Sequence, residues 1–343
     1  MSANGVRKRH SLVVFLVLLG LGLATFLGYY FIYVPYFEAE PTSTQRTMIL
    51  MDTVVDVRVD GGDSEELVER VFTVMDDLEG LLSRFISDSE ISEINRRAGQ
   101  WVKVSPITLE VIELGLKMGD LTGGVFDITI GAVLDLWGFG SSQYYVPSDE
   151  EIATVLASVD YTKVEVDKAQ GQVRIPLGTV LDVGGIAKGY IIDIGTNILR
   201  EADVERSIIN AGGDISAIGR RPDNLPWRVG VQNPENPAEI RWILPLDDES
   251  VVTSRDYQRY FTVDDVRYHH IIDPRTGFPA RQLTSVTIVG ENSATCDALS
   301  TAVFVLGLEE GRTLVEKLPD VEALIVSSTD TWISPGLAQV VTQ

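Results

Sequence analysis

The sequence predicts an α+β fold preceded by one N-terminal transmembrane helix. Short strand-like segments come in close pairs, such as 163–166 with 172–175, and such pairs indicate antiparallel hairpins. Segments with apolar residues at helical spacing, such as 106–121 and 293–306, lie between these pairs. Because helices and hairpins follow each other in mixed order, the pattern differs from the regular strand–helix alternation of a doubly wound parallel sheet.

Composition limits the classes of protein that this chain can belong to. Its 343 residues are 45% hydrophobic, which is enough for a sizeable core in one large domain or two ordinary ones. A formal net charge of −22 argues against nucleic-acid binding, which needs a basic face. Cys296 is the only cysteine, so an internal disulfide and a cysteine-rich zinc cluster are both excluded.

The N-terminus has the pattern of an uncleaved membrane anchor. Residues 1–11 form a basic tail, and residues 12–34 contain no charged side chain. At about 1.5 Å per residue, a helix of this length crosses a hydrocarbon core of about 30 Å. Tyrosines gather at the end of the run, as in an aromatic belt, and the basic flank predicts an inside N-terminus. We expect a tether over 35–46 and a folded domain over 47–343.

The first half of that domain is expected to be mainly helical after one strand. Residues 47–59 resemble a strand with Met51-Asp52-Thr53 in its middle, and Ser64 is placed to cap a helix that continues to Leu81. The further expected elements are a loop and short helix over 82–95, a helix over 106–121, a glycine turn over 121–127, a short helix over 128–137, and a surface segment with a polar helix over 141–160.

The second half is expected to be rich in short strands. The expected elements are a hairpin over 163–175, a helix ending near 200, strands at 207–210, 215–218, 227–231, 241–246 and 251–253, a hairpin over 258–271, a strand at 284–289, a helix over 293–306, and a final helix with two short strands.

A strand that ends in two glycines is the first candidate for a ligand site. Apolar residues 180–183 run into Gly184-Gly185, after which Ile186, Tyr190 and Ile194 recur at helical spacing. The first amides of such a helix favour an anion, and Lys188 adds a positive charge. A phosphorylated ligand fits this pattern, although a tight turn with a solvated lysine explains it equally well.

A second candidate lies on the helix over 293–306. Asp297 and Thr301 are four residues apart, so they share one face of the helix and offer only oxygen ligands. Oxygen ligands suit a hard cation such as Mg²⁺, which keeps waters and substrate phosphates as its other ligands. The alternative is structural: the aspartate complements the helix dipole and the threonine bonds within its own helix.

Two adjacent histidines form the third candidate. His269 and His270 point to opposite faces of a strand, so only one of them can face a site, and a structural role is the alternative for either. The chain has no Gly-x-Ser-x-Gly elbow, no Walker A loop and no dinucleotide-binding glycine motif. Together, the three candidates indicate Mg²⁺-assisted chemistry on a pyrophosphate.

The chain resembles the ApbE family of flavin transferases, with matching motifs in family order over residues 46–335. The matching segments are Met51-Asp52-Thr53, 89–92 with Asn95, 123–127, 136–139, 184–189, 210–214, Thr253-Ser254, 270–274 with Gly277, and 297–301. The resemblance implies an ApbE-like (T-fold-like) fold of mixed helices and antiparallel sheets.

The resemblance also implies a reaction and its residues. FAD is the substrate, Mg²⁺ is the metal, and FMN passes to a Ser or Thr hydroxyl of a partner protein while AMP leaves. The implied catalytic residues are His270 and Asp297, and the implied metal ligands are Gly185, Asp297, Ser300 and Thr301. The implied FAD-binding residues are Met51, Phe85, Val125, Phe126, Asp127, Asp182, Lys188 and Ile271.

Partners and location follow from the same resemblance. The acceptor is expected to be a flavoprotein subunit of a membrane redox complex or an exported FMN-binding protein. With its anchor, the chain is expected in the bacterial inner membrane, with the catalytic domain on the periplasmic side. Two alternatives stay open, an FAD pyrophosphatase and a non-catalytic flavin-binding protein. The chain is not expected to modify itself, because it lacks a Ser/Thr-Gly-Ala-Thr segment of the kind the family modifies.

The sequence departs from the family pattern at three positions. Asp52 and Arg255 each stand where the family usually has glycine, and Cys296 stands where it usually has alanine. The first two add side chains near the expected flavin pocket, and Arg255 is a candidate for binding phosphate. The N-terminus also lacks the lipidated cysteine of the lipoprotein members.

Overall fold

A computed structural model of the chain describes residues 19–23, 25–26, 43–61, 64–141 and 143–342. The chain divides into two units, Met1–Thr42 and Ser43–Gln343. Most of the predicted transmembrane segment 12–34 and of its flanks lies outside the described residues, and the described parts, 19–23 and 25–26, are helical. Among the residues described, no helix combines the length and the apolar character needed to span a bilayer. The predicted boundaries at 11, 34 and 46 therefore stay predictions.

An eight-stranded sheet is the centre of the second unit. Its strands, in spatial order, are β1 (Ser43–Leu50), β2 (Thr53–Asp60), β6 (Ser207–Ala211), β7 (Asp214–Ile218), β10 (Ser250–Arg255), β13 (Ser285–Gly290), β14 (Glu322–Val326) and β15 (Thr331–Ile333). Every neighbouring pair is antiparallel. The predicted α+β class with antiparallel sheets is thereby confirmed.

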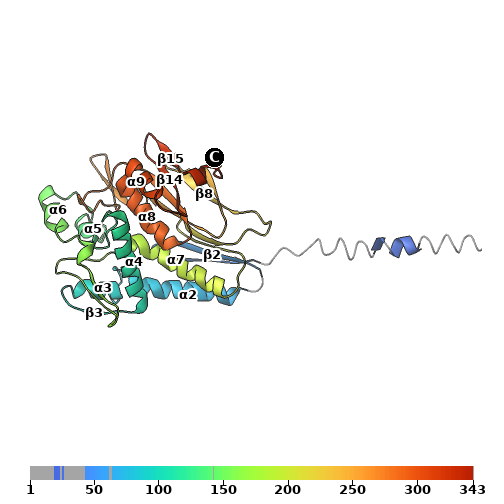
Figure 1. Ribbon diagram of the computed structural model, residues 1–343, viewed down its shortest axis with the longest axis horizontal. Helices are drawn as coiled ribbons and strands as arrows, with labels where there is room; N and C mark the ends of the chain where they lie inside the picture. The colour runs from blue at the N-terminus through green and yellow to red at the C-terminus, as the bar shows by residue number, and fades with distance from the viewer. Residues whose placement is uncertain (1–18, 24, 27–42, 62–63, 142, 343) are drawn as a thin grey trace, which may run out of the picture. The chain divides into compact units, whose positions relative to one another are not determined.

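Three long helices cover one face of this sheet. They are α2 (Glu65–Leu82), α7 (Gly184–Glu201) and α8 (Ser293–Leu306), and Figure 1 shows α2 and α7 lying side by side. Alternate residues of β2, Val55, Val57 and Val59, point into the resulting core and are at most 1% exposed. The helices α2 and α7 bury one apolar face each, whereas α8 is buried on nearly all sides.

A long hairpin covers the opposite face of the sheet. It consists of β8 (Trp227–Asn233) and β9 (Asn236–Leu246), which pair antiparallel. Trp242 and Leu244 of this hairpin are buried against Val251 of β10 in a second apolar cluster. The middle of the sheet is therefore buried between a helical layer and a strand layer, whereas Ile49 of β1 and Val54 of β2 are exposed.

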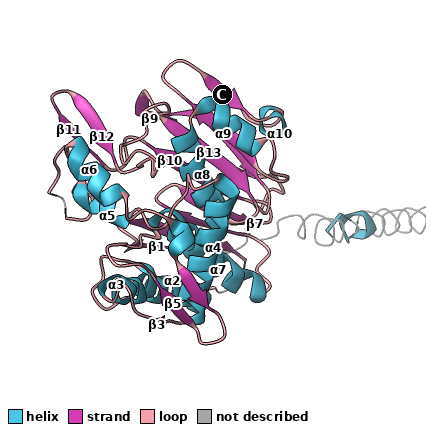
Figure 2. Cartoon of the chain, turned by 60° about the vertical axis from the view of Figure 1, so that its left-hand side comes forward, coloured by secondary structure: helices cyan, strands magenta, loops and turns pink. Residues whose placement is uncertain are grey.

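Smaller elements complete the unit. Figure 2 shows α5 (Gly131–Leu136) and α6 (Asp149–Leu156) beside the separate hairpin of β11 (Tyr260–Val263) and β12 (Val266–His269). Trp137 is fully buried in the apolar cluster of this region. The remaining elements are α3 (Glu90–Arg96), β3 (Val102–Lys103), α4 (Pro106–Thr122), a 3₁₀ turn (Tyr161–Lys163), β4 (Glu165–Asp167), β5 (Gln172–Arg174), α9 (Leu308–Val315) and α10 (Pro335–Ala338).

Three local expectations were wrong. Residues 180–183 do not form a strand before α7, because only Val180 makes a bridge, with Ile130. The segment 47–59 is not one strand, because a two-residue turn at Met51-Asp52 folds it into β1 and β2, and both residues have positive φ (53° and 55°). Such a turn usually carries glycine, asparagine or aspartate at both positions, so Met51 is the residue that hid it from prediction. The hydroxyl of Ser64 does not cap α2 but donates to the carbonyl of Gly61 at 3.1 Å.

Candidate functional site

A cavity of about 490 Å³ opens where α2, α7, α8, β10 and the end of β12 meet. Nearly all of the predicted site residues line it, although they come from segments far apart in the sequence. The predicted residues in its wall are Met51, Phe85, Val125, Phe126, Asp127, Asp182, Gly185, Lys188, His270, Ile271, Asp297 and Thr301. The fold thus brings the three candidate motifs of the sequence into one site.

Close packing of α7 on α8 places the carboxylate of Asp297. Gly189 permits this approach, because a Cβ atom there would lie 2.3 Å from the carbonyl oxygen of Ser293. The amide of Gly189 donates to Asp297 Oδ2 at 3.1 Å. Asp193, one turn further along α7, accepts the amides of Ser293 and Ala294 and so caps α8. Each helix therefore orients the other at the cavity wall.

Charge is concentrated at the inner end of the cavity. Lys188 forms an ion pair with the buried Asp214, whose other oxygen accepts the amide of Thr253 at 3.2 Å. Burial and the neighbouring Asp214 carboxylate raise the pKa of Asp297 to about 7, although Lys188 acts in the opposite direction. Burial lowers the pKa of Lys188, but Asp214 and Asp297 outweigh it and raise that pKa above its ordinary value. A further cation beside Asp297 would relieve the cost of its buried negative charge.

The donors near Asp297 fit a hard cation that keeps part of its own solvent shell. Thr301 lies one helical turn after Asp297, and a Cβ atom on Gly185 would lie 3.6 Å from Thr301 Oγ1. A carboxylate, a hydroxyl and the backbone of Gly185 therefore converge. Over the described parts of the chain, no cluster of three or more His, Cys, Asp or Glu side chains forms a metal site. A site of this composition suits Mg²⁺, which binds few protein ligands together with waters and phosphate oxygens.

Two of the predicted side chains face partners in the protein instead of the cavity space. Ser300 is fully buried and does not line the cavity, because its hydroxyl is bonded to Ser254 Oγ at 2.7 Å and to the carbonyl of Asp297 at 2.9 Å. Asp127 does line the cavity, but its carboxylate accepts bonds from Thr129 and from the amide of Tyr161. These contacts shape the wall of the site.

The two histidines have different environments. His269 is buried, and it bonds the carbonyl of Ala280 through Nε2 and the amide of Ile271 through Nδ1, so it is structural. His270 is half-buried and lines the cavity. Its Nδ1 lies 3.2 Å from the carbonyl oxygen of Arg259, which can only accept, so the ring proton is on Nδ1 and Nε2 is a free base. Burial and the nearby Arg259 lower the pKa of His270 to about 4, which keeps the ring neutral at physiological pH.

The cavity also contains charged residues to which the sequence had given no role. Arg84, Asp214, Arg259 and Glu79 all line it. Asp214 belongs to the glycine turn over 211–214, and Arg84 adjoins the predicted FAD contact Phe85. Their positions in or next to matched motifs indicated that they could belong to the site. Their ion pairs could not be predicted, because these depend on contacts between distant segments.

The three residues that depart from the family pattern lie in different surroundings. Asp52 lines the cavity. The amide of Met51, the residue before it in the turn, donates to Glu79 Oε2 at 2.6 Å. Arg255 does not line it, because its guanidinium donates to Gln232 Oε1 at 2.6 Å. Cys296 is buried behind Asp297, and burial raises the pKa of its thiol.

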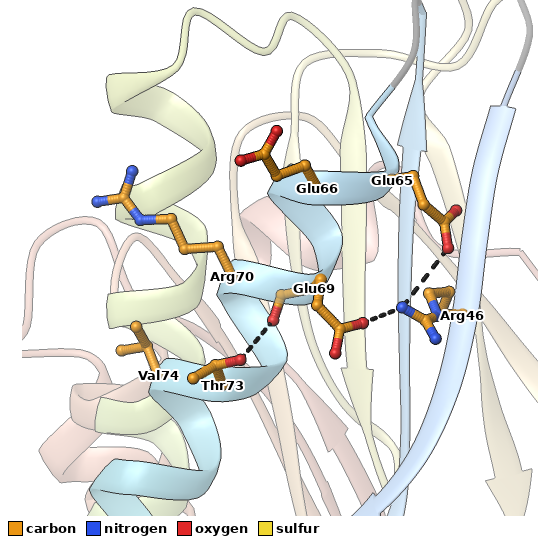
Figure 3. Close-up of a pocket in the computed structure, with 7 residues that line it drawn as sticks. All are labelled: Arg46, Glu65, Glu66, Glu69, Arg70, Thr73 and Val74. Carbon is orange, nitrogen blue, oxygen red and sulfur yellow. Dashed lines mark hydrogen bonds and ion pairs between the residues drawn. The ribbon is translucent and has the colours of Figure 1, made fainter.

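A second hollow, of about 700 Å³, lies over β1 and α2 (Figure 3). Arg46 pairs there with Glu65 and Glu69. All seven residues drawn come from these two neighbouring elements, and none belongs to a motif identified in the sequence. The chemistry is therefore assigned to the first cavity.

Comparison with known proteins identifies the family of the chain. The family model described as "ApbE family" matches residues 51–325. The chain is 33% identical over 303 residues to the FAD:protein FMN transferase of Treponema pallidum, covering 82% of this chain and 83% of that protein. It is 34% identical over 267 residues to a Klebsiella pneumoniae protein of the same name, covering 77% and 83%.

Solved structures show the same architecture. The ApbE protein of Thermotoga maritima superimposes with a TM-score of 0.83 at 34% identity, over 87% of this chain and 99% of that one. The flavinyl transferase ApbE of Pseudomonas stutzeri, in its apo form, gives 0.79 at 29% identity, over 88% and 97%. Fold and relatives together define a transferase enzyme. The chain belongs to the ApbE family, as its motifs predicted.

Proposed function

We propose that this enzyme transfers FMN from FAD to a Ser or Thr hydroxyl of a partner protein, in a Mg²⁺-dependent reaction that releases AMP. The observation that carries the proposal is the composition of the cavity. Asp297, Thr301 and the Gly185 backbone offer oxygen ligands, and Lys188 adds positive charge at the N-terminal end of α7. His270 supplies a neutral base in the same cavity.

The residues of the cavity divide between the two ends of FAD. The ring system packs against Phe85, and the pyrophosphate lies at the start of α7, where the positive end of the helix dipole and Lys188 offset its charge. The acceptor oxygen forms a bond to the phosphorus of the FMN half, and the bond from that phosphorus to the AMP oxygen breaks. The hydroxyl proton passes to Nε2 of His270, which is unprotonated beforehand.

The metal donors would be Asp297, Thr301 and the Gly185 backbone, because these line the cavity whereas Ser300 does not. The ion that these donors would hold, Mg²⁺, would supply positive charge to offset the negative charge of the pyrophosphate oxygens. Asp297 contributes the only full negative charge of this donor set, so its ionisation controls how tightly the ion is held.

This ionisation predicts a specific pH dependence. The pKa of Asp297 is raised to about 7, so below that pH a proton must leave before the cation binds. We expect the half-saturating Mg²⁺ concentration to be about tenfold higher at pH 6 than at pH 8, since one proton competes for one carboxylate. The rate at saturating Mg²⁺ should stay nearly constant, because His270 is neutral at both values. Initial rates over a Mg²⁺ series at each pH measure both quantities, and equal half-saturation would contradict the assignment.

The acceptor and the location follow the same proposal. The acceptor is a flavoprotein subunit of a membrane redox complex or an exported FMN-binding protein. The uncharged run 12–34 anchors the catalytic domain on the periplasmic side of the bacterial inner membrane. In fractionated cells, the full chain should remain with the membranes after carbonate extraction, whereas a chain starting at residue 38 should be released. Release of the full chain would remove the anchor from the proposal.

A product assay separates transfer from its alternatives. The protein is incubated with FAD and Mg²⁺, with or without a small domain that carries a Ser-Gly-Ala-Thr segment, and AMP and free FMN are measured. A transferase releases AMP mainly when the acceptor is present, and little free FMN. Equal AMP and free FMN without acceptor would indicate an FAD pyrophosphatase, and bound FAD without products would indicate a flavin-binding protein.

A further inference from the structure

Arg84 joins three segments of the cavity wall through one buried guanidinium. Its side chain is 8% exposed, and Nε donates to Asp182 Oδ2 at 2.5 Å. The two terminal nitrogens donate to both oxygens of Asp135, at 2.9 and 3.1 Å. The loop after α2, the approach to α7 and the end of α5 are thus held by a single side chain.

Each of these contacts leads to a different part of the site. The guanidinium carbon of Arg84 lies 4.7 Å from the ring centre of Phe85, a residue that is 51% exposed in the cavity wall. The other oxygen of Asp182 accepts the amide of Gly184 at 2.8 Å, which shapes the turn that begins α7. Arg84 therefore connects the aromatic end of the cavity with its phosphate end.

An ion cluster around a buried guanidinium, with Asp182 13% and Asp135 47% exposed, is poor evidence for added stability, but it specifies geometry. Desolvation of the charges offsets most of their attraction. The planar fork of arginine, however, satisfies two carboxylates at fixed angles, which a lysine ammonium cannot do.

We propose that Arg84 is a positioning residue that holds the Phe85 ring and the Gly184-Gly185 turn at a fixed separation. At this separation, the ring and the pyrophosphate of one flavin dinucleotide can bind at the same time. The inference rests on the proposed function only in taking FAD as the ligand. A ligand held at two points loses affinity steeply when the points move apart, since the second contact then needs distortion. A ligand held only by its ring is much less affected.

The test compares FAD with riboflavin, which has the ring but no phosphate. Dissociation constants for both are measured by flavin fluorescence with the purified protein, without turnover. In Arg84→Lys, the preference for FAD, given as the ratio of the riboflavin and FAD dissociation constants, should fall about ten- to a hundredfold. A preference within about twofold of the wild-type value would overturn the proposal, because the arginine would then contribute almost nothing to the preference for FAD over riboflavin.

Arg58→Lys is the matched control. Arg58 also pairs with a buried aspartate, Asp60, at 2.8 Å and lies over a ring, that of Trp227, but it does not line the cavity. Its variant should keep the wild-type preference, and an equal fall there would show that general loosening is the cause. If Arg84→Lys does not fold, Asp135→Ala takes its place, because it removes one partner of Arg84 and leaves Asp182 untouched, and the same two outcomes decide.

The binding test of Arg84 and the assay of FMN transfer give results that can be told apart. If the wild-type protein prefers FAD but attaches no FMN to an acceptor, the transferase proposal fails while the binding ratio still decides the role of Arg84. If the wild-type protein shows no preference for FAD over riboflavin, the proposal for Arg84 fails whatever the transfer assay shows.

Discussion

Replacing Asp297 by alanine is expected to lower Mg²⁺-dependent FMN transfer by about a thousandfold or more. The carboxylate is the charged member of the proposed donor set, and a bound cation supplies several kcal/mol of charge stabilisation in the transition state. The fold should persist, because Asp297 contributes one hydrogen bond, from the Gly189 amide, and its burial is itself costly. Initial rates of AMP release with acceptor, together with thermal unfolding, measure the two effects separately.

Cys296→Ala is the matched control for this variant. Cys296 precedes Asp297 on α8 and is 1% exposed, but its thiol faces the interior beside Gly290 and does not line the cavity. The change is small in volume and should leave the transfer rate near that of the wild type. Full activity in Asp297→Ala would remove Asp297 from the metal site, and an inactive Cys296→Ala would indicate that packing of α8 is responsible.

The second large effect is expected at His270. Its replacement by alanine should reduce the rate of transfer about 10²- to 10⁴-fold, the usual contribution of a positioned general base. FAD binding should change little, because the proposed role concerns the proton of the acceptor hydroxyl and not the flavin. Single-turnover rates and flavin fluorescence, measured on the same preparation, separate the two.

His269→Ala gives the contrasting result. His269 is buried and bonds both Ala280 and Ile271, so its loss leaves a cavity and unpaired backbone groups, and the melting temperature should fall clearly. His270→Ala should change the melting temperature much less, since His270 makes one side-chain bond at the cavity edge. A His270→Ala protein that transfers FMN at the wild-type rate would exclude the base role.

Periodicity and turn residues predicted most of the fold. The helices α4, α7 and α8 and the hairpins β4–β5 and β11–β12 appear close to where their patterns place them. The turn at Met51-Asp52 was missed because Met51, at its first position, is not a usual turn former at positive φ. The surroundings of Met51, whose amide bonds Glu79, depend on packing between β1 and α2, which local sequence does not record.

The site was predicted by motif more than by geometry. The sequence placed Asp297 and Thr301 on one helical face, and both line the cavity. It did not predict that Lys188 pairs with Asp214, because that contact depends on where β7 lies relative to α7. Ser300 shares the same short motif, yet its hydroxyl is bonded to Ser254 Oγ and to the carbonyl of Asp297, and Ser300 itself does not line the cavity.

The most direct test of Mg²⁺-dependent FMN transfer is an intact mass spectrum of an acceptor domain after incubation with residues 38–343, FAD and Mg²⁺. We expect the mass of the acceptor to increase by that of one FMN less one water, on the serine or threonine of its Ser-Gly-Ala-Thr segment. We expect EDTA to prevent this increase. An acceptor of unchanged mass, with FAD converted to free FMN and AMP, would contradict the proposed transfer. So would an adduct that forms at the same rate in EDTA, since no divalent cation would then take part.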